Sequence, residues 1–417
     1  MTQTGLKGRE RAFDRLCHRL VGSGRLSVRY PSGAVREYGD GTGNAARFHI
    51  RRPQALTRIA LNPEFALGEA WMEGDIALEQ GDLGDALTQL LKAGGAGRAG
   101  AMAGWLRALR RLRRRLDQFN PAGRARRNVA HHYDLDDGLF DLVLDADKQY
   151  SCAYFEHEGM GLEAAQAAKK NHIAGKLCLE DGQRVLDIGC GWGGMALTLA
   201  RQANVSVLGV TLSQRQLDVA RQRAEAAGLS ERVRFELVDY RALEGRFDRI
   251  VSVGMFEHVG IDHYSEFFET VRGRLAPGGI ALIHSIGRMD GPGYTNPWLA
   301  KYIFPGGYIP ALSETLPHVE RAGLLTGDIE ILRLHYARTL QAWRRRSQGS
   351  RERIEALYDR RFFRMWEFYL ASSEAAFRSG QMMVFQLQLL ADLEAAPLTR
   401  DYMYTPAARQ AEDRRAA

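Results

Sequence analysis

The stretch of sequence that decides the fold is Val185-Leu186-Asp187-Ile188-Gly189-Cys190-Gly191-Trp192-Gly193-Gly194. Its largely apolar first half is typical of a buried strand, and a helical pattern follows its last glycine. The glycines between them permit a turn in which the backbone approaches a ligand closely. We therefore predict a strand, a ligand-binding turn and a helix in succession.

Strand-like and helical segments continue to alternate after this turn. The strand-like runs lie at 205–211, 232–239, 247–254 and 280–287. Helical patterns at 213–229 and 264–279 lie between successive runs. Alternation of this kind predicts a doubly wound, Rossmann-like α/β sheet. The fold class that we expect is α/β, with a smaller accessory domain at the N-terminus.

The glycine-rich turn has to be assigned to one kind of ligand. Gly189, Gly191 and Gly194 satisfy the GxGxxG pattern of dinucleotide sites, which also need an acidic residue at the end of the second strand. This chain has Gly209-Val210-Thr211 there, and its acidic residue is Asp187, just before the glycines. A carboxylate at that position would repel a pyrophosphate but suits the ammonium and sulfonium groups of S-adenosylmethionine (SAM). The sequence favours SAM, and a turn without a ligand is the alternative.

The composition is that of a soluble globular protein. The chain has 417 residues, with 57 basic and 50 acidic side chains and a net charge of +7. This length exceeds one ordinary domain, and 45% hydrophobic with 26% charged residues excludes disordered, collagen-like and coiled-coil chains. We recognise neither a signal peptide nor an apolar run of membrane-spanning length. We expect a cytoplasmic protein whose four cysteines, which form no CxxC pair, are free thiols.

Positive charge is concentrated in one segment of the chain. Between Arg107 and Arg127 there are nine arginines and a single acidic residue, Asp117, so the local charge is 9 − 1 = +8. Apolar residues at helical spacing share the opposite face, which predicts a basic amphipathic helix. Such a helix can lie on an anionic membrane surface. A solvated face on a helix that packs against the protein's own core is the alternative. Nucleic acid is disfavoured, because no nucleic-acid motif accompanies the patch.

These patterns divide the chain into four expected parts. An accessory domain at 1–92 precedes a Gly- and Ala-rich linker and the basic helix at 93–124. The catalytic domain follows at 125–400, and a tail occupies 401–417.

Two segments of the expected catalytic domain have a special composition. The segment 288–314 is crowded with Gly, Pro and aromatic residues and is long for a loop, which is typical of a lid over an apolar channel. Ordinary core packing of its rings is the alternative. The apolar segment 362–390 reads as an amphipathic helix on the lipid side or in the core.

Four motifs in the chain resemble one enzyme family. They are YSCAYF (150–155), LDIGCGWGG (186–194), GVTLSQRQ (209–216) and VSVGMFEHVG (251–260). They resemble the cyclopropane-fatty-acyl-phospholipid synthases and the mycolic acid cyclopropane synthases, over about residues 125–395. NPEFALGEAWMEGD (62–75) is similar to an N-terminal domain that the bacterial phospholipid enzymes carry and the mycolic acid enzymes lack. The resemblance implies a class I SAM-dependent methyltransferase of the phospholipid branch.

The resemblance also implies a reaction and a pocket for it. A methylene group would pass from SAM to the cis double bond of an unsaturated phospholipid acyl chain, through a carbocation that bound bicarbonate deprotonates. The positions that match the family's bicarbonate pocket are Cys152, Glu257, His284, Ile286 and Tyr336. All but Glu257 can donate a hydrogen bond to a small anion, Ile286 through its backbone N–H. Glu257 would accept from bicarbonate or orient His284.

The cofactor's surroundings follow from the resemblance and, for Asp187, from the charge argument above. From the methionine end to the adenine they are Tyr150, Ser151, Asp187, Gly189, Gly191, Thr211, Gln216, Asp239 and Tyr240. A turn or helix-cap role is the alternative for Asp239. No metal is expected, because neither HExxH nor paired thiolate spacing occurs among the candidate ligands. Those candidates are His131, His132, Glu156, Glu158, His258 and His263.

The expected partner is an unsaturated phospholipid in a membrane, bound by a protein that associates peripherally with the anionic inner face. The sequence leaves open whether two chains form a homodimer. Quenching the carbocation by a hydride shift or by water would instead give methyl-branched, methylene or hydroxylated chains. Two further alternatives are less well supported. N-methyltransferase relatives share Glu257 and His284 but generally lack the full bicarbonate set and the N-terminal domain, so Cys152 and Tyr336 argue against them. A non-enzymatic lipid-binding protein would be expected to have lost the catalytic residues.

Overall fold

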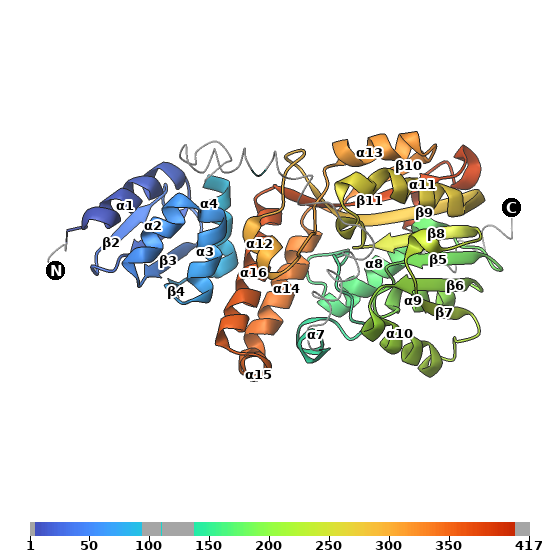
Figure 1. The fold of residues 1–417 in the computed structure, drawn as a ribbon, viewed down its shortest axis with the longest axis horizontal. Helices are drawn as coiled ribbons and strands as arrows, with labels where there is room; N and C mark the ends of the chain where they lie inside the picture. Colours follow the sequence, from blue (N-terminus) through green and yellow to red (C-terminus); the bar gives the residue numbers. More distant parts are fainter. Residues whose placement is uncertain (1–4, 94–109, 111–136, 405–417) are drawn as a thin grey trace. The chain divides into compact units, whose positions relative to one another are not determined.

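The computed structural model describes residues 5–93, 110 and 137–404 (Figure 1). The chain divides into two compact units. The first comprises 1–114, 294–305 and 340–382, and the second comprises 115–293, 306–339 and 383–417. In the described part of the chain, no helix is both long and apolar enough to cross a membrane.

This division differs from the domains expected from the sequence. Segments 294–305 and 340–382, expected within the catalytic domain, belong to the first unit together with the N-terminal residues. The linker and basic helix expected at 93–124 lie outside the described residues, apart from Ala93 and Arg110. The N-terminal accessory region is thus part of a unit that later segments of the chain complete.

The first unit is built around a four-stranded sheet in the order β2-β1-β3-β4. The strands are β1 (Arg25–Arg29), β2 (Val35–Tyr38), β3 (Ala45–Ile50) and β4 (Ile76–Gln80). The helices from the N-terminal segment are α1 (Gly8–Leu20), α2 (Pro53–Leu61), α3 (Pro63–Met72) and α4 (Leu83–Ala93). Proline opens α2 and α3, where its fixed φ suits the first turn and its missing N–H leaves no bond unmade.

The later segments add helices to this unit. They are α12 (Pro297–Tyr302), most of α14 (His335–Gly349), α15 (Arg351–Leu357) and α16 (Arg360–Arg378). Buried Arg344 on α14 donates to Asp82 at 2.7 and 2.8 Å and to Glu374 on α16 at 3.0 Å. Each buried charge has a partner, which offsets the cost of its desolvation. These bonds fasten segment 340–382 to the N-terminal residues.

Within the described residues, the second unit holds a seven-stranded sheet in the order β10-β11-β9-β8-β5-β6-β7. The strands are β5 (Arg184–Ile188), β6 (Ser206–Thr211), β7 (Val233–Leu237), β8 (Phe247–Val253), β9 (Leu275–Arg288), β10 (Leu325–Ile331) and β11 (Met382–Leu390). The strands from β9 to β7 in this order pair in parallel, and β10 pairs antiparallel with β11. The α/β fold expected from the sequence is confirmed.

Helices cover both faces of this sheet (Figure 1). One core joins the sheet to α8 (Leu162–Leu177), α9 (Gly194–Gln202) and α10 (Gln214–Ala226). The other core joins it to α11 (Tyr264–Arg274) and α13 (Leu312–Arg321). Helices from both cores therefore pack against the sheet, so the parallel strands are buried on both sides.

The expectation of one helix over 362–390 is wrong. Helix α16 ends at Arg378, Gly380 adopts a φ of +78°, and the chain continues as strand β11. Residues 383–390 are all buried, so the strand lacks the polar alternation that distinguishes a strand from a helix in sequence. In the aromatic segment 288–314, Trp298 and Tyr308 are fully buried, which agrees with core packing for these two rings.

Candidate active site

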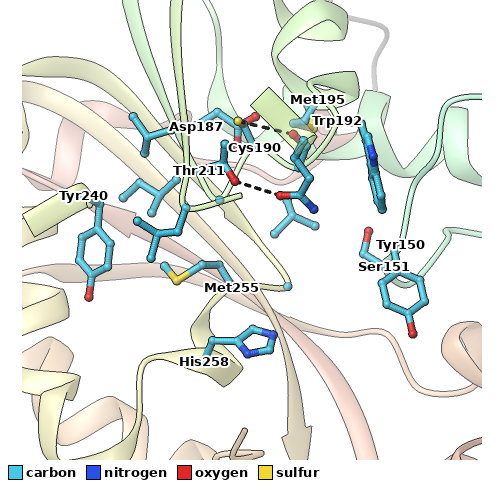
Figure 2. Close-up of a pocket in the computed structure, with 18 of the residues that line it drawn as sticks. Tyr150, Ser151, Asp187, Cys190, Trp192, Met195, Thr211, Tyr240, Met255 and His258 are labelled. Atoms are coloured by element: carbon cyan, nitrogen blue, oxygen red, sulfur yellow. Dashed lines mark hydrogen bonds between the residues drawn. The ribbon is translucent and has the colours of Figure 1, made fainter. Parts of the chain in front are cut away.

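The strand order creates a switch point beside β5. From β5 the sheet extends through β6 to β7 on one side and through β8 to β9 on the other. Parallel strands that diverge in this way leave a crevice at their carboxyl ends, where ligands bind. A pocket lies there, with Tyr240 at one end and Tyr150 and Ser151 at the other (Figure 2).

All nine residues expected around the cofactor line this pocket. They are Tyr150, Ser151, Asp187, Gly189, Gly191, Thr211, Gln216, Asp239 and Tyr240. Other lining residues are Lys148, Gln149, Cys190, Trp192, Met195, Met255 and His258. Phe140 on α7 (Asp137–Val143) supports the wall, because its ring packs edge-on against both Tyr150 and Trp192.

Glycine is required in the turn after β5 for two different reasons. Gly193 has a φ of +83°, and a Cβ added there would lie 2.7 Å from the Phe235 ring, so this glycine permits helix α9 to pack on the sheet. Gly191 also has a positive φ, of +54°, but a Cβ there would meet nothing within 4 Å. Because Gly191 lines the pocket, the open space beside it is available to a ligand.

Asp187 is the buried charge of this pocket. Its side chain is 1% exposed, and burial raises its pKa to about 7. Among the described residues no hydrogen-bond partner reaches its Oδ2. A buried carboxylate oxygen without a partner is costly unless a ligand supplies a donor. The ammonium group of SAM is a donor of the required charge, so the residues present fit this cofactor.

Polar side chains line the pocket beside β6 and β7. Thr211 Oγ1 donates to Gln216 Oε1 at 2.9 Å, at the point where β6 passes into α10 (Figure 2). Asp239 accepts from the backbone and side chain of Arg241, and it caps the 3-10 turn η1 (Tyr240–Ala242). This is the cap role that the sequence left open. Asp239 also lines the pocket, so its contact with an adenine ring stays a prediction.

Glu257 and Ile286 are bonded to each other and do not belong to the lining of the pocket. Glu257 lies in the 3-10 turn η2 (Phe256–His258) after β8, and its Oε1 accepts from the Ile286 backbone N–H at 2.7 Å. Burial raises the pKa of Glu257 to about 7, while the bond from Ile286 acts in the opposite direction. No partner among the described residues reaches Oε2. The carboxyl group can therefore exchange a proton near neutral pH, and the Ile286 donor expected for an anion is engaged by Glu257.

His284 is buried on β9, where it pairs with Val253 of β8. The Gln386 amide nitrogen lies 3.1 Å from His284 Nδ1, and an amide nitrogen can only donate. Nδ1 is then the acceptor, and the proton of the neutral ring is on Nε2. Burial, reinforced by Lys169, lowers the His284 pKa to about 3. His284 is thus a neutral imidazole that can donate through Nε2.

Cys152 and Tyr336 come from segments that are bonded to each other. Thr339 on α14 accepts from the Ala153 backbone N–H at 3.0 Å, and His335 Nδ1 accepts from the Phe155 N–H at 2.9 Å. These bonds place the first turn of α14 beside Cys152. The Cys152 thiol donates to the Ala153 carbonyl at 3.3 Å, and burial raises its pKa, so it remains a neutral thiol.

The five residues expected to bind bicarbonate therefore form two groups. Glu257, Ile286 and His284 lie on the β8 and β9 side, and Cys152 and Tyr336 lie on the α14 side. None of the five lines the pocket described above, but Ser151 and Gly254 do, and both are neighbours of these groups. Gly254 donates to the His284 carbonyl at 2.9 Å, and a Cβ on it would lie 3.9 Å from Ser151 Cβ. Bicarbonate binding by all five stays a prediction.

Sequence reasoning missed some residues of the pocket. The sequence offers His258 only as a candidate metal ligand, whereas it lines the pocket and burial lowers its pKa to about 4. Its position directly after Glu257 in VSVGMFEHVG was the signal available. His131 and His132 lie outside the described residues. In the described ranges, no three His, Cys, Asp or Glu side chains are grouped so as to hold a metal ion.

Comparison with known proteins places the chain in a family. Residues 121–387 match the family described as mycolic acid cyclopropane synthetase, and residues 16–95 match a domain of unknown function, DUF7884. The cyclopropane-fatty-acyl-phospholipid synthase of Escherichia coli K12 is 38% identical over 342 residues, which cover 82% of this chain and 87% of that protein. A probable fatty acid methyltransferase of Pseudomonas putida is 35% identical over 373 residues, covering 85% and 90%.

A solved structure agrees with this assignment. The crystal structure of mycolic acid cyclopropane synthase CmaA1, complexed with SAH and CTAB, matches with a TM-score of 0.61 and 32% identity. The match covers 66% of this chain and all of that one. The seven-stranded sheet and the pocket at its carboxyl edge are the features of a class I SAM-dependent methyltransferase. The chain therefore belongs to the mycolic acid cyclopropane synthetase family and is a SAM-dependent methyltransferase.

Proposed function

We propose that this protein is a cyclopropane-fatty-acyl-phospholipid synthase, which adds a methylene group from SAM to the cis double bond of an unsaturated phospholipid. The observation that carries the proposal is the buried Glu257 carboxyl, whose Oε2 has no partner among the described residues and which directly precedes the pocket-lining His258 in the chain. N-methylation of an amine or O-methylation of a hydroxyl needs a base near the acceptor heteroatom. Ring formation needs a base for a C–H proton inside a dry site, which is what a buried carboxyl with a pKa near 7 can provide.

The N-terminal region supports the phospholipid as substrate. The match to the Escherichia coli synthase covers 82% of this chain, whereas the match to the mycolic acid enzyme covers 66%. The domain at 16–95 lies before residues 121–387, which match the family model of the mycolic acid enzymes. A chain that keeps this domain is expected to share the substrate class of the phospholipid enzyme.

The roles of the residues follow from their chemistry. Bound SAM supplies the electrophilic methyl group. Asp187 offers Oδ2 to the ammonium group of the ligand, and the open space at Gly191 lets the backbone approach it. Glu257 Oε2 can take up a proton, and the buried surroundings of His284 and Cys152 exclude water that would quench a carbocation.

A small anion is part of this proposal. Bicarbonate would be held by donors from His284 Nε2, the Cys152 thiol and the Tyr336 hydroxyl, and it would take the C–H proton at the acyl chain and pass it to Glu257 Oε2. The neutral His284 imidazole fits such an anion as a donor, and the Cys152 thiol would join it by turning from the Ala153 carbonyl. Ile286 would join them only if its N–H turned from Glu257 to the anion.

One alternative product class has support of its own. The Pseudomonas putida relative is named a probable fatty acid methyltransferase, and its identity of 35% is close to the 38% of the synthase. A carbocation that does not close to a ring can lose a proton after a hydride shift to give a methylene chain, add water to give a hydroxylated chain, or take up hydride from a reductant to give a methyl branch. Product structure, and not overall identity, must therefore separate the two functions.

The experiment uses phospholipid vesicles and methyl-labelled SAM. Vesicles of monounsaturated phospholipid should take up label, and vesicles of the saturated phospholipid with the same head group should not. Label in both kinds of vesicle would point to the head group as acceptor and would contradict the proposal. Loss of the double bond in the labelled lipid would distinguish ring formation from addition that retains the alkene.

We also propose that the protein works as a peripheral protein at the anionic inner face of the membrane, through the arginines between 107 and 127. Arg110 is excluded from this role, because it pairs with Glu64 at 2.5 Å and lies over the Tyr294 ring. The variant to test therefore carries Gln at Arg111, Arg113, Arg114 and Arg115. It should pellet less with anionic vesicles than wild type does, and unchanged pelleting would rule the segment out.

A charge-matched control is available on α1. Four arginines there are exposed: Arg9, Arg11, Arg15 and Arg19. Their replacement by Gln changes the net charge equally. If this control lost as much vesicle binding as the first variant, the effect would be one of net charge and not of the segment 107–127.

A further inference from the structure

One face of helix α8 binds segment 149–152, which forms the expected methionine end of the SAM site. Segment 149–152 contains Tyr150 and Ser151, which line the pocket, and Cys152. Gln166 and Lys169 lie three positions apart on α8, so their side chains share one face of the helix. Both side chains have an exposure of 0%.

Gln166 binds the backbone of this segment. Its Nε2 donates to the Gln149 carbonyl at 3.1 Å and to the Ser151 carbonyl at 3.0 Å. One helix position further back, the Ala165 carbonyl accepts from the Tyr154 backbone N–H at 3.0 Å. Helix α8 therefore fixes the path of the backbone from residue 149 to residue 154.

Lys169 binds the side chains of the same segment. Its Nζ donates to Gln149 Oε1 at 2.6 Å and to Ser151 Oγ at 2.7 Å. An ammonium group has no lone pair, so Ser151 Oγ must be the acceptor of this bond. The hydrogen of the Ser151 hydroxyl then points away from Lys169 and is available to an acceptor in the pocket. The Gln149 amide nitrogen is also engaged, because Nε2 donates to Asp147 Oδ2 at 2.9 Å.

Within the described part of the chain, Lys169 is held by hydrogen bonds to neutral groups and not by an ion pair. Among the described residues no carboxylate lies at ion-pair distance from its Nζ, and Asp145 and Asp147 act on it only from farther away. Burial lowers its pKa to about 8, which means that the folded protein bears a cost for holding the charge. An apolar side chain of the same length would avoid that cost. The charge is retained beside the pocket, where the methionine carboxylate of SAM would be the acceptor for Ser151.

We propose that Gln166 and Lys169, together the α8 clamp, are positioning residues that fix segment 149–152 and orient the Ser151 hydroxyl as a donor to the carboxylate of bound SAM. The α8 clamp would thereby tie the methionine end of the cofactor site to Cys152, the next residue along the chain. The inference deepens the proposed function, but it rests only on SAM binding at this pocket and not on the acceptor lipid or the product.

The test compares two lysines of the same helix. Lys169→Met removes the clamp, and Lys176→Met is the matched control, because Lys176 is also 0% exposed on α8 but pairs with Glu330 on β10. We expect Lys169→Met to weaken binding of S-adenosylhomocysteine (SAH) by about tenfold or more, as the loss of charge-assisted bonds implies. Lys176→Met should lower the unfolding temperature and leave the SAH affinity as in wild type.

A truncated ligand separates positioning from a general loss of structure. Methylthioadenosine lacks the amino acid part of SAH, so Lys169→Met should leave its affinity unchanged. Ser151→Ala should weaken SAH binding, and adding Lys169→Met to it should cause little further loss, because both changes remove the same contact. In turnover, the KM for SAM should rise while the KM for lipid stays constant.

The proposal is overturned if Lys169→Met binds SAH as wild type does, or if it loses SAH and methylthioadenosine affinity equally. If Lys169→Met does not accumulate as folded protein, Gln166→Met decides alone, since it removes the two backbone bonds at a similar volume. An unchanged SAH affinity in that variant would overturn the proposal. All of these readouts use ligand binding without lipid, so failure of the lipid chemistry would not be mistaken for failure of the clamp.

Discussion

Replacement of Glu257 by Gln separates the chemistry of this residue from its place in the fold. The amide keeps an oxygen that can accept from the Ile286 N–H, a bond of 2.7 Å in the native protein. The amide cannot take up a proton. We expect Glu257→Gln to bind SAH as wild type does and to lose about 10²–10⁴ in kcat, the usual contribution of a group that transfers a proton.

The same substitution has a calculable effect on stability. Glu257 has a pKa of about 7 in the folded protein against an ordinary value of 4.5. The unfolded chain therefore releases its proton first as the pH rises, and the folded state loses stability between about pH 4.5 and 7. The difference amounts to about 3 kcal/mol above pH 7, at 1.36 kcal/mol for each pKa unit. Gln does not titrate, so Glu257→Gln should match wild type near pH 4.5 and exceed its stability by about 3 kcal/mol at pH 8.

Two assays check this reasoning. Urea unfolding of both proteins at pH 4.5 and pH 8 measures the stability difference, in which all other titrating groups cancel. Turnover with monounsaturated vesicles measures kcat. A stability difference that does not change with pH would refute the burial of a protonated carboxyl, and full activity of Glu257→Gln would refute its role in proton transfer.

Three further substitutions test other parts of the structure. Asp187→Asn should weaken SAH binding at least about tenfold, because the amide cannot offset the ligand's ammonium charge; calorimetry that finds wild-type affinity would remove Asp187 from the site. Gly193→Ala should lower stability by about 1–3 kcal/mol, since its Cβ would meet the Phe235 ring at a positive φ, and an unchanged urea midpoint would contradict this. Arg344→Met should lower the free energy of unfolding by about 3–5 kcal/mol, because it leaves buried Glu374 without its α14 partner. A variant more stable than wild type in urea unfolding would contradict this.

The features that could be predicted best from the sequence are those that a single short motif determines. The strand and glycine turn from Val185 to Gly194 predicted both the sheet and the pocket, because a buried strand that runs through a glycine-rich turn into a helix is typical of a ligand-binding α/β sheet. Most of the nine residues expected around the cofactor were located through the family resemblance. Gly189, Gly191 and Asp239 follow strand ends, which parallel strands bring together, whereas Tyr150 and Ser151 follow no strand. The position of Glu257 directly after β8 follows from the same rule.

Other features depended on contacts that a single sequence does not reveal. Strand β11 is buried on both faces and reads as a continuous apolar run, which a helix also produces. Gln166 and Lys169 are polar residues on a helix and read as a solvated face, although both are fully buried. Segment 340–382 joins the first unit through Arg344 and Asp82, which are far apart in the chain and carry no mutual signal.

The most direct test of the central claim uses SAM with a fully deuterated methyl group and vesicles of monounsaturated phospholipid. Ring formation requires that a base remove one deuteron from the transferred group. The account predicts a labelled lipid that has lost its double bond and carries a CD2 group, with the yield falling sharply in Glu257→Gln. A product that keeps the intact CD3 group as a methyl branch would contradict ring formation, and it would assign this methyltransferase to the branched-chain chemistry instead.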